Sequence, residues 1–138
     1  KKNPHLKFNI FGMNNIQPIW GDEFKKNLFN SKIALNLSQG KPLKYYSSDR
    51  IAQLMGNGIA TLIDKKTKLN NVFSESEAIF YKSKKDLNKK LNLMIKLNSQ
   101  RNKLAKKGRI KYHQKYNSTI IADYIVCKTF GIKRNFNW

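Results

Sequence analysis

Short apolar runs that alternate with amphipathic stretches restrict the fold of this chain more than any other feature. Three runs have the length and composition of buried strands, at residues 33–37, 59–63 and 77–81. Residues 6–13 alternate apolar and polar side chains and stop at a glycine and an asparagine pair, which is typical of a strand that enters a turn. We therefore expect four strands, the first of them at residues 6–13.

The segments between these runs carry the signals of helices. Residues 22–30 begin with two acids and place apolar side chains at helical spacing, so they predict a short amphipathic helix. The sequence SSD at 47–49 offers N-cap chemistry to a second helix, which the GNG turn at 56–58 ends.

The carboxyl-terminal part of the chain predicts helices only. Apolar residues recur at three- and four-residue intervals through residues 84–116, with a break near Asn98 and Ser99 that divides the segment into two helices. A third helix is expected from residue 118 to residue 130, capped by Gly131. Strands separated by helices indicate an α/β domain with a mainly parallel sheet and right-handed crossovers, followed by a helical tail.

The length and the charge limit the remaining possibilities. A chain of 138 residues has room for one domain, and 40% hydrophobic residues are enough to build its core. Lysine and arginine number 28 against 8 acidic residues, so the formal net charge is +20. Only four of these cations are arginines, the residue that nucleic-acid-binding proteins prefer for contacts with bases and phosphates. The many lysines are accompanied by many asparagines and isoleucines, whose codons are common in A+T-rich coding sequences. Most of the charge is expected to be background, although it favours an anionic partner.

Other reactive side chains give weak signals. His5 and His113 have no acid nearby in the sequence and are expected to be solvated, whereas Glu75 and Glu77 are expected to be loop and strand-edge acids. Cys127 lies on an apolar helix face, cannot form an internal disulfide and fits a reducing compartment. No metal-ligand cluster is visible, and the longest apolar stretches are shorter than a membrane span. These features predict a cytoplasmic protein without a metal.

The most informative segment is residues 40–64. It reads as a loop and the start of a helix, and a helix amino terminus binds anions through its free amides and its dipole. The hydroxyls of Ser47 and Ser48 and the Arg50 guanidinium suit a diphosphate, and Gln53, one turn later, would reach the hydroxyls of an attached ribose. The preceding loop adds Lys41, Lys44, Tyr45 and Tyr46. Alternatively, a serine serves only as the N-cap, Arg50 is a solvated cation and Gln53 is a surface amide.

The residues from Arg50 to Asp64, RIAQLMGNGIATLID, resemble the pattern Arg-x-x-Glu-x-x-x-x-Gly-x-x-x-x-x-Asp in the carboxyl-terminal domain of group 1 glycosyltransferases of the GT-B fold. A strand similar to IALNLS precedes that pattern in the family, and the tail that begins at EAIFY is also similar. The resemblance covers residues 32–131 and implies a Rossmann-like three-layer fold. It also implies that residues 1–138 are the carboxyl-terminal half of a two-domain enzyme, an expectation that the missing initiator methionine supports.

In this family the carboxyl-terminal half binds the nucleotide-sugar donor, and another Rossmann-like half binds the acceptor. By position, Arg50 would contact the diphosphate and, with Lys44, stabilise charge on the leaving group. Gln53 stands where the family commonly has a glutamate for the ribose, and this departure leaves the donor's affinity and identity open. The same site would be lined by Lys41, Tyr45, Ser47 and Ser48. Gly12 and Asn14 would lie near the nucleobase, unless they only form the turn after the first strand.

The resemblance implies a whole enzyme that transfers a sugar, of hexosyl type, to a glycan or lipid-linked acceptor in cell-envelope polysaccharide synthesis. Such an enzyme needs no metal, and the isolated domain would bind nucleotide without turnover. A lipid-linked acceptor would place it at the inner face of the membrane, with a peripheral contact to anionic lipid.

A non-enzymatic basic α/β module that binds nucleic acid or another polyanion is the main alternative. Residues 82–115 would provide its nucleic-acid-binding surface. However, the lysines of this segment are expected to be scattered around the helices, and its aromatic residues lie only near its end, so a solvated surface is favoured. A flavodoxin-like signalling domain is disfavoured, because no acidic cluster follows the first strand.

Overall fold

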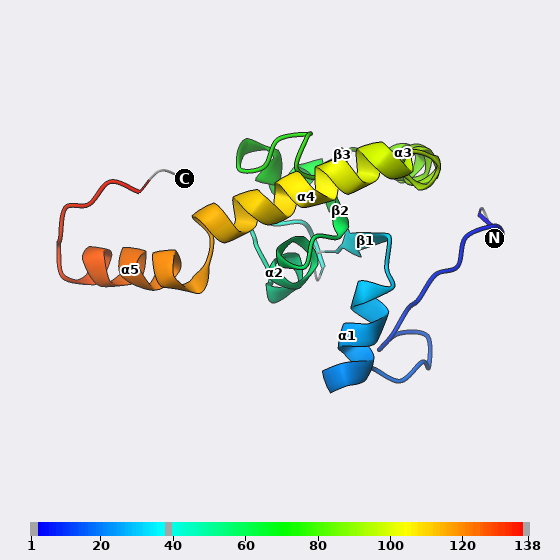
Figure 1. The fold of residues 1–138 in the computed structure, drawn as a ribbon, viewed down its shortest axis with the longest axis horizontal. Helices are drawn as coiled ribbons and strands as arrows, with labels where there is room; N and C mark the ends of the chain where they lie inside the picture. The colour runs from blue at the N-terminus through cyan, green and yellow to red at the C-terminus, as the bar shows by residue number, and fades with distance from the viewer. Residues whose placement is uncertain (1–2, 38–39, 137–138) are drawn as a thin grey trace. The chain divides into compact units, whose positions relative to one another are not determined.

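The computed structural model describes residues 3–37 and 40–136 (Figure 1). Ser38 and Gln39, part of the loop predicted to end a strand, lie outside the described residues. The backbone contacts divide the chain into two compact units, Lys1–Ser31 and Lys32–Trp138. The sheet and the segment that resembles a diphosphate site belong to the second unit.

The described part of the first unit holds one helix, α1 (Gly21–Phe29). Asp22 and Glu23 lie in its first turn, where acids complement the positive end of the helix dipole. Leu28 is the buried residue of this helix. The helix predicted at residues 22–30 is therefore confirmed.

The strand predicted at residues 6–13 is wrong. This segment forms no strand, because the described part of its unit contains no second strand with which it could form a hydrogen-bonded ladder. The turn after it is present: Gly12 has a φ of +70°, and its N–H donates to the carbonyl oxygen of Ile16 at 3.0 Å. Alternating apolar and polar side chains therefore did not suffice to form a strand here.

The second unit is built on a parallel sheet. Its strands, in spatial order, are β1 (Ile33–Asn36), β2 (Ala60–Asp64) and β3 (Ile79–Tyr81). Ile33 is in register with Ala60, and Leu62 is in register with Ile79. Each strand overlaps the apolar run that predicted it, and the expected α/β class with a parallel sheet is confirmed.

The helices of the second unit lie close to their predicted positions. They are α2 (Asp49–Gly56), α3 (Lys84–Lys96), α4 (Asn98–Lys115) and α5 (Ser118–Thr129), and two short 3-10 helices, η1 (Lys65–Thr67) and η2 (Leu69–Asn71), follow β2. Side-chain caps fix two helix starts, since Ser83 accepts from the Asp86 N–H and Asn117 accepts from the Ile120 N–H. The break between α3 and α4 falls at Leu97, next to the predicted Asn98 and Ser99.

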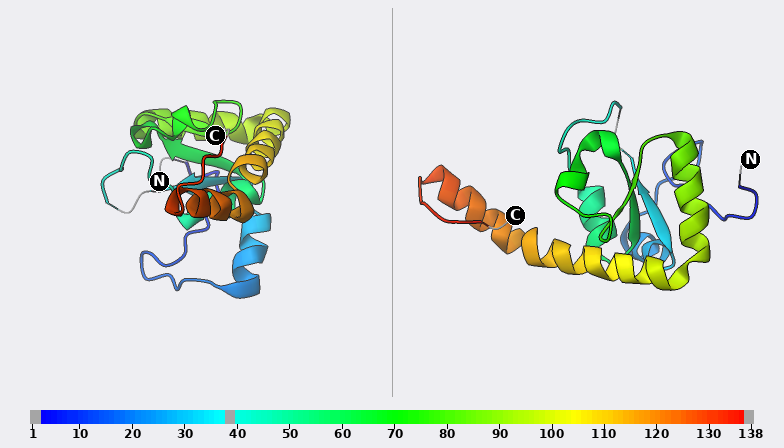
Figure 2. Two further views of the ribbon diagram at one scale, coloured as in Figure 1. Left: turned by 90° about the vertical axis from the view of Figure 1, so that its left-hand side faces the viewer. Right: turned by 90° about the horizontal axis from the view of Figure 1, so that it is seen from above.

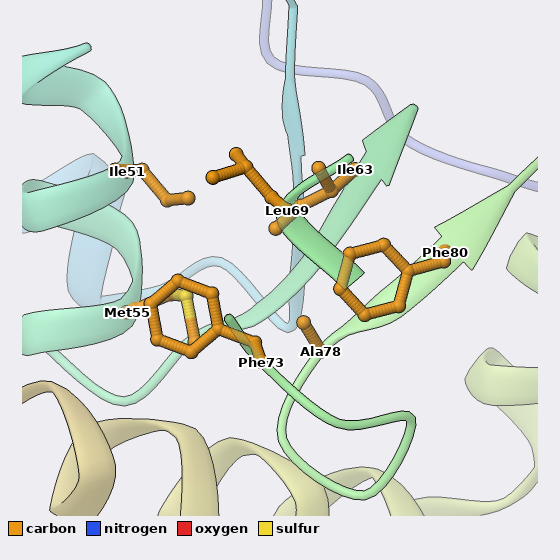
Figure 3. Packing of buried hydrophobic residues seen from close by; sticks show 7 residues of the cluster. All are labelled: Ile51, Met55, Ile63, Leu69, Phe73, Ala78 and Phe80. Atoms are coloured by element: carbon orange, nitrogen blue, oxygen red, sulfur yellow. The ribbon is translucent and has the colours of Figure 1, made fainter. Parts of the chain in front are cut away.

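Helices and loops cover both faces of the sheet and give the domain its layers. One face packs against α2 and the segment after β2 through Ile51, Met55, Ile63, Leu69, Phe73, Ala78 and Phe80 (Figure 3). On the other face, Ala60, Leu62, Ile79 and Tyr81 pack against Leu87, Leu91, Met94 and Leu104 of α3 and α4. Burial of these apolar surfaces is the main favourable contribution to folding.

Helix α4 runs along the end of the sheet from which the strands start (Figure 2). A Cβ atom at Gly108 would overlap the carbonyl oxygen of Glu77, just before β3. The Arg109 side chain lies against Gly58, just before β2, where an added Cβ atom would be 3.3 Å from its Cδ. Helix α4 thus covers the amino edge, and the opposite edge, at the carboxyl ends of the strands, is the one at which open α/β sheets generally bind ligands.

A buried arginine fixes the corner between α3 and α4. Arg101 is 6% exposed, and its Nη1 donates to the carbonyl oxygens of Met94 at 3.0 Å and Ile95 at 3.4 Å. These carbonyls belong to the last turn of α3, where intrahelical donors run out. The expectation of a solvated basic run is therefore wrong for Arg101.

Three of the exposed lysines of α3 share one face. Lys85, Lys89 and Lys96 are spaced by one and by almost two turns, and all three are exposed. Leu87 and Met94, on the opposite side of the helix, pack against the sheet. Lys84, which is also exposed, lies about 100° away from this face, so the lysines of α3 are only partly gathered on one side.

Helix α5 and the segment after it pack on each other, as expected of a helical tail. The rings of Tyr124 and Phe136 are 5.3 Å apart, and Arg134 forms an ion pair with Asp123. Cys127 is buried on this helix, as its apolar surroundings predicted. None of the helices in the described ranges combines the length and the hydropathy that crossing a bilayer requires.

Candidate functional site

The start of α2 is fastened to the carboxyl end of β1. The Arg50 guanidinium donates a hydrogen bond to the carbonyl oxygen of Leu37, directly after β1. Asn36, the last residue of β1, is in register with Ile63, whose side chain belongs to the same cluster as Ile51 of α2. Residues in register on parallel strands share a face, so the Asn36 side chain lies on the face that α2 covers.

Asn36 has an unusual environment for a polar side chain. It is 6% exposed, and among the described residues its Oδ1 is a fully buried atom without a hydrogen-bond partner. Buried polar atoms nearly always have a partner, so an unpartnered acceptor points to a donor that the described residues do not supply. A hydroxyl or N–H group of a ligand would satisfy it.

The first turn of α2 is not capped by a side chain. Ser48 occupies the N-cap position, as predicted, but its hydroxyl accepts no capping hydrogen bond. The Ile51 N–H donates to the Ser48 carbonyl oxygen at 3.0 Å, which closes the first backbone turn. Backbone N–H groups in the first turn of a helix attract an anion when no side chain caps them, and the positive end of the helix dipole adds to this attraction.

The loop before α2 is tied to the segment that follows β2. The Tyr45 N–H donates to the carbonyl oxygen of Thr67 at 2.7 Å, and the Tyr45 hydroxyl accepts from Nδ2 of Asn71 at 3.0 Å. Lys44 Nζ lies 5.2 Å from the centroid of the Tyr45 ring, within the range of a cation–π contact. These contacts fix the position of Lys44 within the loop that leads into α2.

Most of the predicted site residues lie in this one region. Lys44, Tyr45, Ser47, Ser48 and Arg50 follow one another from the loop into α2, and Lys41 and Gln53 are exposed on either side of them. Gly12 and Asn14 belong to the first unit, where both have a positive φ. Their contact with a nucleobase stays a prediction.

The sequence does not single out every residue of this edge. Thr67 and Asn71 are far from Tyr45 along the chain, and only the fold brings them together. Asn36 carries a readable signal, because a polar residue at the end of a buried strand lies where ligands bind in such sheets. Asp64, the last residue of the family-like pattern, caps η1 by accepting the Lys66 N–H at 2.9 Å.

Two ionisable groups near this edge have shifted pKa values. A hydrogen bond and the positive charge from Lys65, whose Nζ is 2.8 Å from Oε1 of Glu75, lower the pKa of that carboxyl. Burial, with the charge of Asp64, raises the pKa of Tyr81. The lowered pKa makes the Glu75 carboxylate a weaker base, and the raised pKa keeps Tyr81 protonated at pH 7, so neither is suited to act as a general base.

Side chains elsewhere do not form a competing centre. His113 is exposed, and its Nε2 lies 2.9 Å from the carbonyl oxygen of Gly56, at the amino edge of the sheet. The described ranges contain no group of three or more His, Cys, Asp or Glu side chains that would hold a metal ion. An open hollow of about 540 Å³ lies between α5 and residues 131–136, and no predicted site residue lines it.

Comparison with known proteins agrees with the fold and with the family-like pattern. No curated protein and no solved structure matches the chain. A family model described as glycosyl transferase-like matches residues 1–126, and it is of the group 1 carboxyl-terminal type that the sequence resembles. Because this match covers nearly the whole chain, the protein belongs to the glycosyl transferase-like family.

Proposed function

We propose that this domain binds the diphosphate of a nucleotide-sugar donor at the start of α2. The observation that carries the proposal is the combination of an uncapped helix start with the buried, unpartnered Oδ1 of Asn36. Arg50 is next to both, since it is in the first turn of α2 and donates to Leu37, the residue after Asn36. Few arrangements of this kind arise without a ligand, because an unpartnered buried acceptor destabilises the fold.

The charged groups of this region have distinct roles in the proposal. The Arg50 guanidinium has five N–H donors, and those not directed at Leu37 would bind diphosphate oxygens. Lys44, held over the Tyr45 ring, would supply a second cation, and Lys41 a more distant one. As the sugar leaves the diphosphate, these cations and the α2 amides would stabilise the charge that develops on it.

The uncharged groups would orient the rest of the donor. Gln53 lies one turn after Arg50 and is exposed, so its amide would hydrogen-bond the ribose hydroxyls. The Asn36 carbonyl accepts hydrogen bonds and cannot bind a deprotonated phosphate oxygen, so its partner would be a hydroxyl or N–H group of the donor. Ser47 and Ser48 would add hydroxyl donors to the diphosphate.

The complete enzyme, in this proposal, transfers a hexose to a glycan or lipid-linked acceptor of the cell envelope. A second Rossmann-like half would bind the acceptor and supply any general base, and residues 1–138 alone would bind nucleotide without turnover. No metal is required, because protein cations and helix amides would neutralise the leaving group. The α3 face with Lys85, Lys89 and Lys96 would give a peripheral contact with anionic lipid.

The experiment is a calorimetric titration of the chain with uridine, guanosine, adenosine and thymidine diphosphates and with a random-sequence oligonucleotide. We expect saturable binding of at least one nucleoside diphosphate. A module that binds polyanions would instead bind only the oligonucleotide, and its affinity would fall steeply between about 50 and 200 mM salt. That second result would contradict the proposed function and support the nucleic-acid alternative.

A further inference from the structure

The connection from β1 to α2 needs an anchor to position its charged groups. It spans residues 37–48, whereas connections between strands and helices in α/β domains usually have about 2–6 residues. In its described part, Leu43 accepts from the Tyr46 N–H at 3.3 Å and closes a turn. Tyr45 is at the third position of this turn and has a φ of +58°.

That backbone conformation is unfavourable for tyrosine. A positive φ at the third position of a turn is normally adopted by glycine, because a β-carbon crowds the backbone there. A bulky residue keeps this conformation only when other contacts hold it. Strained residues of this kind concentrate at ligand sites, where a fixed geometry has a function.

Three contacts hold Tyr45 in place. Its N–H donates to Thr67, its hydroxyl accepts from Asn71, and its ring lies beneath the Lys44 ammonium group. The Asn71 amide is oriented for this contact, because its Oδ1 already accepts from Asn70 at 3.3 Å, which leaves Nδ2 for Tyr45. The two hydrogen bonds join the loop before α2 to the segment after β2, across the carboxyl edge of the sheet, whereas the contact with Lys44 lies within the loop.

We propose that Tyr45 is a positioning residue that clamps the β1–α2 loop to Thr67 and Asn71, and so fixes Lys44 and the start of α2 for the donor diphosphate. This inference rests on the proposed function and changes the role of Tyr45 within it. Its hydroxyl and its N–H are used by the protein itself, so Tyr45 orders the groups that bind the ligand. The clamp is present without ligand, which lowers the entropy lost when the diphosphate binds.

The clamp is tested first in the free chain, by amide hydrogen exchange observed at the Tyr45 N–H. We expect this amide to be protected, and Tyr45→Phe and Asn71→Ala each to raise its exchange rate by about twofold to tenfold, the effect of one hydrogen bond. Tyr46→Phe is the matched control, because the described residues give its hydroxyl no hydrogen bond, and it should leave the rate unchanged. Exchange of the parental Tyr45 amide at the rate of an unstructured peptide would overturn the clamp, whatever the chain binds.

The positioning role is tested with the nucleoside diphosphate that the chain binds best. Tyr45→Phe and Asn71→Ala should each raise the Kd by about twofold to tenfold, and the double variant should match the single ones, because all three lose the same bond. Their melting temperatures should fall by no more than a few degrees, the effect of one hydrogen bond, so both variants stay folded when the affinity is measured. The Kd of Tyr46→Phe should equal the parental value. Parental affinity in both variants would overturn the positioning role and leave the proposed function intact. A parental chain that binds no nucleoside diphosphate would overturn the proposed function and the positioning role together, while the exchange data would still decide whether the clamp exists.

Discussion

The Arg50 guanidinium donates a hydrogen bond to the carbonyl oxygen of Leu37 and so joins the first turn of α2 to the carboxyl end of β1. The two residues flank the loop that carries the charged groups of the proposed site. Arg50 therefore has a structural contact in addition to the diphosphate contact that family resemblance implies. Substitutions that retain its charge and substitutions that remove it should separate the two roles.

Arg50→Met should weaken binding of a nucleoside diphosphate by about tenfold or more, since it removes a charge-assisted contact. Arg50→Lys should fall between Met and the parent, because lysine retains the charge but has no planar fork to bind Leu37 and phosphate together. The measurement is the Kd by calorimetry. Arg109→Met is the control, because Arg109 is an exposed arginine at the amino edge, and its Kd should equal the parental value. Equal loss in both variants would show a general effect of net charge.

Gly108→Ala should destabilise the domain by about 1–3 kcal/mol, because the added methyl group meets the Glu77 carbonyl oxygen and lies 3.1 Å from Cε of Met55. The measurement is the free energy of unfolding from urea denaturation. Gly56→Ala is a matched control, since its Cβ would be 3.8 Å from the Tyr112 ring, an ordinary contact. That variant should keep or slightly raise stability. A parental stability for Gly108→Ala would mean that α4 does not press against the start of β3.

Arg101→Met should lower the free energy of unfolding by about 1.5–3 kcal/mol, because it removes a buried charged donor from the part-buried carbonyls of Met94 and Ile95. Lys103→Met, an exposed position on the same helix, should change stability by less than about 0.5 kcal/mol. Thermal and urea unfolding of both variants test this difference. Equal stabilities would show that Arg101 is solvated in solution, as the sequence alone suggests.

Asp86 should make the stability of α3 dependent on pH in the acidic range. A hydrogen bond from the Lys82 N–H at 2.9 Å, and the charges of Lys90 and Lys82, hold the pKa of this carboxyl below its ordinary value of 3.8. A lowered pKa in the folded state means that the contribution is complete above the ordinary pKa and is lost as the pH falls through the folded value.

Asp86→Asn should therefore lower the melting temperature at neutral pH. The difference between the melting temperatures of this variant and of the parental chain should shrink as the pH falls below 3.8. Asp22→Asn serves as the control, because the Asp22 side chain is almost fully exposed. A difference for Asp86→Asn that is constant with pH would show that its carboxylate has no net effect in the folded state.

Local patterns in the sequence predict most of the second unit. Helix α2 follows from a serine N-cap, apolar spacing and the glycines at 56 and 58, and β2 follows from its apolar run. These signals lie within a few residues of the element that they specify. The segment at residues 6–13 shows the limit, because alternation specifies which side chains share a face and not whether a neighbouring strand exists.

The contacts that organise the candidate site could not be predicted in the same way. Pairs such as Arg50 with Leu37 and Tyr45 with Asn71 join residues that are distant along the chain, and only the parallel register brings them to one edge. Charge patterns were also ambiguous, since Arg101 is buried although most charged side chains of its run are exposed. The family-like pattern located the start of α2, because its arginine lies in the first turn of that helix and its glycine in the turn that follows the helix.

The most direct test follows backbone and side-chain amide resonances by nuclear magnetic resonance while a nucleoside diphosphate is added to the chain. A diphosphate bound at the start of α2 should shift the N–H signals of Ser48, Asp49 and Arg50 and the side-chain amide of Asn36. The amides of Lys103 and Lys107 on α4 should keep their positions. Shifts confined to the α3 and α4 lysines, with Arg50 and Asn36 unchanged, would contradict a donor site at the carboxyl edge of the sheet.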